Sequence, residues 1–224
     1  MASRVLVGTV LVLGMVLLWA GSVVHYGDGN ASDPAAMLAD VHAYPTANLV
    51  KAVIGVASML CFLVAGVGLS AMVQGRGRPA TVGVTILLAL GAVSHLLGAS
   101  VIMFLVRVTA VGMAPSDELT VTTQLVELQG IYFFGLIPFL LALLLLPAAL
   151  WRARMVSWIP FALIAADVTV IGQFTGDVTP ASVLWWIDPV ISIAAYTWLA
   201  AGIIRYYPTS ESTPASAPFT EPIH

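Results

Sequence analysis

One carboxylate, Asp167, lies inside an otherwise apolar stretch of the chain, VSWIPFALIAADVTVIGQF (residues 156–174). An ionised aspartate at the centre of a membrane-spanning helix costs about 2.5–3.5 kcal/mol on insertion scales. A chain that keeps a carboxylate at such a depth supplies a partner or a wet cavity, or keeps the group protonated. A protonated carboxyl in apolar surroundings can serve as a general acid, so we expect Asp167 to be a functional residue.

Four further ionisable side chains lie within apolar segments of the sequence. Lys51, Glu127 and Asp188 fall near the ends of their segments that are expected to face outward. His95, in GAVSHLLGAS, falls near the depth of Asp167. We expect all five groups to form one polar cluster in a cavity that opens outward. In this cluster Asp167, Glu127 and Asp188 are the candidate catalytic residues, with Asp167 as the acid and either of the others as the base or orienting group.

The residues around this cluster could bind a substrate. Asp188, Ser192 and Tyr196 recur at intervals of four residues, which places them on one face of a helix. Aromatic side chains could shape an apolar pocket and stabilise cationic intermediates. The candidate binding residues are His95, Lys51, Gln129, Tyr132, Phe133, Gln173, Trp185, Ser192 and Tyr196.

The same residues also have structural interpretations. Lys51 and Glu127 lie close enough to the headgroup region to extend toward it, or to pair with each other between two helices. Asp188 precedes a proline and could cap the helix that follows. A histidine at the depth of His95 is commonly hydrogen-bonded to a neighbouring helix. Only Asp167 lies too deep for its charge to reach the headgroups, which is why its functional interpretation is favoured.

The composition identifies the class of protein that positions these groups. Hydrophobic residues make up 60% of the 224 residues and charged residues only 8%, whereas soluble domains contain about 25% charged residues. Apolar runs of about 20 residues recur along the chain, the length that spans a bilayer. We therefore predict an all-α bundle of six transmembrane helices in a single domain, residues 1–207. A tail, residues 208–224, is rich in Ser, Thr, Pro and Glu and is expected to be disordered and cytoplasmic.

The expected spans cover about residues 5–24, 48–73, 80–106, 124–150, 156–174 and 183–204. Asp33-Pro34 predicts the start of a short interfacial helix over residues 35–44 in the first outer loop. With six spans, one side of the membrane carries Arg4, Arg76, Arg78, Arg152, Arg154 and Arg205. The other side carries the carboxylates Asp28, Asp33, Asp40, Asp117, Glu118 and Asp177. The positive-inside rule then predicts a multi-pass protein of the cell membrane with both termini in the cytoplasm.

Several function classes are disfavoured by the motifs that the sequence lacks. It contains no HExxH, CxxC, Walker or GxSxG motif, and its single cysteine, Cys61, provides no disulfide framework. We predict no cofactor and no metal. No basic patch indicates nucleic acid, so the expected partners are the lipid bilayer and a lipophilic small molecule, and the oligomeric state stays open.

The function we favour from these residues is a membrane-embedded cyclase or isomerase that acts by acid–base catalysis on a terpenoid or polyketide-like molecule. A small proton- or ion-coupled transporter, with Asp167 and His95 as its relay, is the first alternative. A non-catalytic subunit or immunity protein of a membrane assembly is the second.

Four sequence segments carry a resemblance to known proteins: DPAAMLADVHAYPTANL, GRGRPATVG, GAVSHLLGAS and WRARMVSWIPF. Together they resemble a family of six-helix bacterial integral membrane proteins that is known only as a domain of unknown function. More distantly, the chain is similar to small integral-membrane terpene cyclases. That resemblance implies a helical bundle with intramembrane carboxylates as proton donors, although those enzymes usually have a seventh helix.

Overall fold

The computed structural model describes residues 2–25, 33–167 and 182–206, and every regular element in these ranges is helical. The elements are α1 (Ala2–Val24), α2 (Pro34–Ala43), α3 (Pro45–Met72), α4 (Arg78–Val111), α5 (Pro115–Arg152), α6 (Ile159–Ala166) and α8 (Ile187–Arg205), with 3₁₀ turns at Gly75–Gly77 and Val183–Trp186. Among these described helices, α1, α3, α4 and α8 are long and apolar enough to cross a membrane. The predicted all-α membrane fold is confirmed to that extent.

Prolines in the first turn mark where helices begin, because a proline there loses no helical hydrogen bond. The clearest case is α2, which starts at Pro34 directly after Asp33. The Asp33 carboxylate accepts hydrogen bonds from the backbone N–H groups of Ala35 and Ala36, at 2.9 and 3.3 Å. The predicted short helix in the first loop is therefore present, and it ends at Ala43, one residue before its predicted end.

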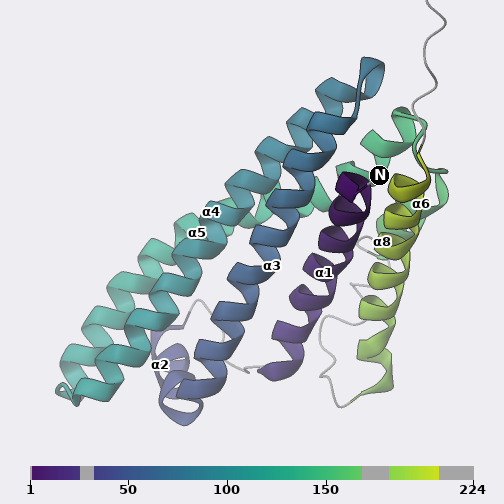
Figure 1. Cartoon of the computed structure of the whole chain (residues 1–224). Helices are drawn as coiled ribbons and strands as arrows, with labels where there is room; N and C mark the ends of the chain where they lie inside the picture. Colours follow the sequence, from purple (N-terminus) through teal and green to yellow (C-terminus); the bar gives the residue numbers. More distant parts are fainter. Residues whose placement is uncertain (1, 26–32, 168–181, 207–224) are drawn as a thin grey trace, which may run out of the picture.

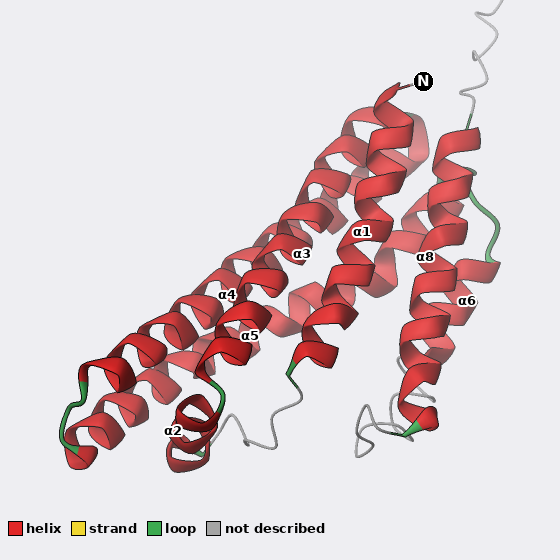
Figure 2. Ribbon diagram, turned by 60° about the horizontal axis from the view of Figure 1, so that its bottom comes forward, coloured by secondary structure: helices red, strands yellow, loops and turns green. Residues whose placement is uncertain are grey.

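The helices follow one another across the bundle in a definite order. Figure 1 shows α1 between α3 and α8, and α4 between α3 and α5. α6 packs against α8 at the far edge, as Figure 2 shows from a second direction. α2 is short and lies across the ends of α4 and α5. α5 also packs against α6, so the α3–α4–α5 side of the molecule and the α6–α8 side are joined both through α1 and through α5.

Three aromatic side chains join the helices at the centre of the bundle. Phe62 of α3 packs edge-on against Phe139 of α5 and Tyr196 of α8, with ring centroids 5.6 and 6.0 Å apart. None of the three is more than 2% exposed. The Tyr196 hydroxyl also donates a hydrogen bond to the Leu143 carbonyl of α5 at 3.0 Å. Buried aromatic contacts of this kind contribute strongly to packing, so this cluster fixes α3, α5 and α8 relative to one another.

The two ends of the bundle differ in charge. At one end the Arg4 guanidinium donates a hydrogen bond to the Tyr206 carbonyl, which joins the start of α1 to the end of α8. Gly77, before α4, lies against Ala153, just after α5. The described arginines at this end are Arg4, Arg78, Arg152, Arg154 and Arg205. The opposite end, where α2 lies (Figure 1), carries the carboxylates Asp33, Asp40, Asp117 and Glu118, together with one arginine, Arg107 near the end of α4.

Candidate functional sites

Asp167 directly follows α6 and is only 6% exposed. Two side chains of the neighbouring helix α8 reach its carboxyl group. The Ser192 hydroxyl donates a hydrogen bond to Asp167 Oδ2 at 2.5 Å, and the Asp188 carboxyl lies close enough for its charge to act on Asp167. Asp188 and Ser192 are one turn apart on α8, so the four-residue spacing seen in the sequence directs both toward one carboxyl.

The closeness of two carboxyl groups has a chemical consequence. Ionised carboxylates only accept hydrogen bonds, so Asp167 and Asp188 can bond to each other only when one of the two groups holds a proton. The other oxygen of Asp167, Oδ1, is buried, and no N–H or O–H group of the described residues donates to it. Repulsion between two adjacent charges also disfavours ionisation of both groups. The pair can therefore hold one proton between the buried carboxyl of Asp167 and the half-buried carboxyl of Asp188.

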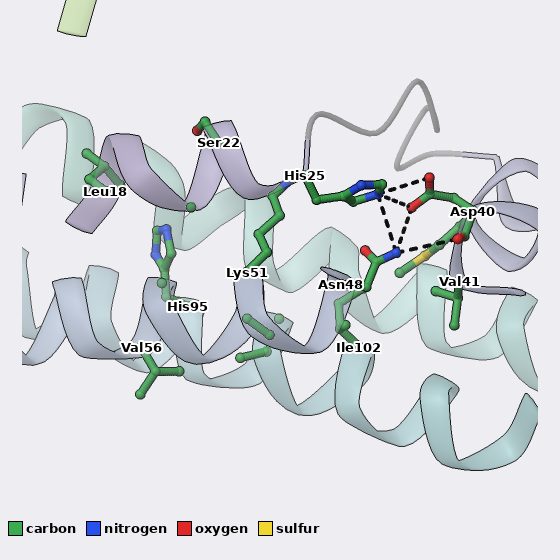
Figure 3. Close-up of a pocket in the computed structure, with 16 residues that line it drawn as sticks. Leu18, Ser22, His25, Asp40, Val41, Asn48, Lys51, Val56, His95 and Ile102 are labelled. Carbon is green, nitrogen blue, oxygen red and sulfur yellow. Dashed lines mark hydrogen bonds and ion pairs between the residues drawn. The ribbon is translucent and has the colours of Figure 1, made fainter. Parts of the chain in front are cut away.

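A separate cavity of about 370 Å³ lies between α1, α2, α3 and α4 (Figure 3). Its polar lining consists of Ser22, His25, Asp40, Asn48, Lys51 and His95. Apolar side chains complete the wall, among them Leu18, Met37, Val41, Val56 and Ile102. The cavity is near the end of the bundle that carries α2, opposite the arginine-rich end.

Three of the polar lining residues form a connected network (Figure 3). His25, just after α1, pairs with Asp40 of α2 at 2.8 Å. The Asn48 amide of α3 donates to the same carboxylate at 2.9 Å and to the Tyr44 carbonyl at 3.2 Å. His25 and Asn48 are 8% and 7% exposed. The network holds α1, α2 and α3 together at the mouth of the cavity, because buried polar groups are costly unless they are paired.

The surroundings of Asp40 shift its titration. Burial alone would raise the pKa of this carboxyl above its usual 3.8. Hydrogen bonds from Asn48 and His25, together with the positive charges of His25 and Lys51, outweigh burial and hold the pKa of Asp40 below that value. The ionised form of Asp40 is thus favoured in the folded chain.

Acidification is expected to weaken this end of the bundle through Asp40. Because its pKa is lower in the folded chain than in the unfolded chain, the unfolded chain binds the proton first, and stability falls as the pH drops below about 4. Asp40→Asn should lower the thermal midpoint at neutral pH and remove this part of the acid sensitivity. The measurement is thermal unfolding of the two proteins in detergent across that pH range. If the thermal midpoints of the two proteins fall in parallel on acidification, Asp40 does not contribute to the acid sensitivity of the fold.

The predicted single cluster of ionisable groups corresponds to two separate places. Lys51 and His95 line the cavity between α1 and α4, whereas Asp167 and Asp188 meet between α6 and α8. α1 lies between these two places (Figure 1). The expectation of one shared cavity is corrected on this point, because depth within the membrane can be inferred from sequence whereas the lateral order of helices cannot.

The remaining predicted site residues that the structure describes belong neither to the cavity lining nor to the contact between Asp167, Asp188 and Ser192. Glu127 is exposed on α5, and it is not among the residues that line the cavity. Trp185 is 5% exposed and packs edge-on against Trp19, with ring centroids 5.6 Å apart. Tyr196 belongs to the central aromatic cluster, so the described contacts of Trp185 and Tyr196 are packing contacts. Three side chains of α5 and one residue after α6 lie outside the described part of the structure: Gln129, Tyr132, Phe133 and Gln173.

Sequence reasoning does not identify the His25–Asp40–Asn48 network as part of a site. The available signal is the concentration of polar residues in and around the short helix α2, in DPAAMLADVHAYPTANL. In the sequence these residues belong only to a loop and to helix ends. Their pairing is not visible there, because it depends on how α2 folds back over α1 and α3. Among the described residues, no group of three or more His, Cys, Asp or Glu side chains could hold a metal ion.

Comparison with known proteins identifies no relative of this chain: no protein-family model, curated protein or solved structure matches it.

Proposed function

We propose that this chain is an integral membrane enzyme that carries out acid–base chemistry on a lipophilic small molecule, as a cyclase or isomerase does. The observation that carries the proposal is the buried contact between Asp167, Asp188 and Ser192. A site that cyclises or isomerises a hydrocarbon needs a group that gives a proton to carbon and a group that removes one from a neighbouring carbon. Two carboxyls that hold one proton provide both.

Each residue of this site has a distinct proposed role. Asp167, buried after the apolar helix α6, is the proton donor, because low polarity favours the neutral acid. Asp188 is the acceptor that is left ionised when Asp167 holds the proton. Ser192 is a positioning residue, since its hydroxyl bonds one Asp167 oxygen and leaves Oδ1 to face Asp188 or a substrate. Apolar surroundings keep water away from a cationic intermediate.

The proposal includes six spans, with α5 and α6 added to the four apolar helices, and both termini in the cytoplasm. The apolar stretch Ile137–Arg152 of α5 supports a further crossing. The concentration of arginines at one end and carboxylates at the other supports this orientation through the positive-inside rule. Exposed Trp151 and Trp158 near the arginine end, and exposed Trp186 toward the other, have the positions of interfacial aromatics.

Solvent deuterium tests this proposal even while the substrate is unidentified. Membranes that contain the protein are incubated in heavy water with a lipophilic extract of cells, and the extract is analysed by mass spectrometry. Proton transfer between a carboxyl and carbon replaces a C–H hydrogen by deuterium. We expect at least one lipophilic compound to gain carbon-bound deuterium only when the protein is present. Protein-dependent movement of protons or solutes across vesicles without any such incorporation would favour a transporter instead.

A further inference from the structure

The cavity between α1 and α4 contains a cation, Lys51, that forms no direct ion pair with a described carboxylate, although its charge acts on Asp40. Lys51 extends from α3 between His95 and the His25 network (Figure 3). Ion pairs among the described residues join His25 to Asp40 and His42 to Glu118, and neither includes Lys51. Lys51 lies six residues into α3, about 9 Å along the helix from its first residue. The Lys51 side chain is exposed on the bundle and lines the cavity, so its ammonium group is accessible to an anion that enters there.

The charge of the cavity limits which anion fits. Among the described residues, Asp40 is the one carboxylate in the lining, and its oxygens already accept hydrogen bonds from His25 and Asn48. Asp40 therefore does not need Lys51 as a partner, yet its negative charge opposes any multiply charged ligand nearby. One ammonium beside one paired carboxylate is suited to a ligand with a single negative charge.

The apolar lining and the volume of the cavity determine what the ligand can contain besides its anionic group. The apolar and small residues of the lining include Leu18, Val56, Ile102, Gly55 and Gly98. The volume of about 370 Å³ is near the lower end of the range of about 300–1,000 Å³ for small-molecule sites. That space suits one hydrocarbon chain better than the two chains of a bilayer lipid.

We propose that the cavity between α1 and α4 binds a single-chain lipophilic carboxylate, with the carboxylate on Lys51 and the chain between α1, α3 and α4. His95 lies beside this chain, with its Nδ1 3.1 Å from the Gly91 carbonyl of its own helix. The site is separate from the Asp167–Asp188 pair, so it does not depend on the catalytic proposal.

The sequence makes this proposal directly testable, because Lys51 is the only lysine in the chain. The full-length protein in detergent is treated with an amine-acylating ester, and acylation of Lys51 is followed by mass spectrometry. A lysine-containing peptide in the same sample reports the reactivity of the reagent. The probes are hexadecanoate, the uncharged hexadecanol and the two-chain anion phosphatidylglycerol.

We expect saturating hexadecanoate to slow acylation of Lys51 by at least about tenfold, with little protection by the other two probes. Equal protection by hexadecanol would overturn the proposal, because it would mean that the charge is not recognised. Protection by phosphatidylglycerol alone would also overturn it, in favour of a bilayer lipid, and so would absence of protection by all three probes.

Two variants test the same contact by binding calorimetry. Lys51→Met keeps the length and the apolar stem but removes the charge, and it should weaken hexadecanoate binding by about tenfold or more. Lys51→Arg keeps the charge and should bind within a few-fold of the wild type. Equal affinity of the Met variant and the wild type would contradict the assignment of Lys51 as the carboxylate partner.

Discussion

Asp167→Asn should lower the rate of protein-dependent deuterium incorporation into the lipophilic substrate by roughly 10²–10⁴-fold. Asparagine has almost the same shape and can still accept the Ser192 hydrogen bond, so the contact between α6 and α8 is retained. What the variant loses is the exchangeable carboxyl proton. The measurement is the rate of incorporation per molecule of folded protein, with folding checked by the thermal midpoint.

Two companion variants separate acid–base chemistry from packing. Asp117→Asn removes a carboxylate that is exposed at the start of α5, and the rate should not change. Ser192→Ala removes one hydrogen bond to Asp167 but leaves both carboxyls, so a smaller loss, about tenfold, is expected. Asp167→Asn with a wild-type rate would eliminate Asp167 as the proton donor.

Gly91→Ala should destabilise the bundle by about 1–3 kcal/mol, because the new methyl group has no space. A Cβ at Gly91 of α4 would be 2.6 Å from the Cβ of Phe139 in α5 and 3.2 Å from its Cα. Atoms so close to the backbone cannot be moved by rotating the ring, so the two helices would have to separate. His95 would also be disturbed, since its ring lies 5.2 Å from that of Phe139.

Gly83→Ala, on the same helix, is the matched control. A Cβ at Gly83 meets no other atom within 4 Å, and alanine is favoured over glycine in a helix by about 1 kcal/mol. The two substitutions are therefore expected to change the thermal midpoint in opposite directions. A rise of the midpoint for both would mean that α4 and α5 are not in close contact at Gly91.

The elements that depend on local rules could be predicted from the sequence. Asp33 and Pro34 determine where α2 begins through a hydrogen-bonded cap and a fixed backbone angle, both of which are properties of adjacent residues. The long apolar segments that form α1, α3, α4 and α8 follow from composition and length alone. The common face of Asp188 and Ser192 follows from helical periodicity, whereas their position beside Asp167 also requires that α6 and α8 are neighbours.

What the sequence could not provide was the order of helices within the membrane plane. Apolar faces that contact lipid and apolar faces that contact protein have similar composition, so hydropathy does not distinguish neighbours. Sequence reasoning therefore groups Lys51 and His95 with Asp167, although α1 lies between the two places. It misses the cavity residues His25 and Asp40 for a related reason, because they meet only when α2 folds back over the ends of α1 and α3.

The proton shared by Asp167 and Asp188 is the feature on which the proposed chemistry depends most directly, and infrared spectroscopy at neutral pH measures it. The carbonyl band of a protonated carboxyl shifts in heavy water, which separates it from other absorptions. We predict one such buried carboxyl in the wild-type protein and its loss in Asp167→Asn, because this change leaves Asp188 as a lone carboxylate beside an amide donor. A wild-type spectrum without this band would mean that both groups are ionised and would contradict the account.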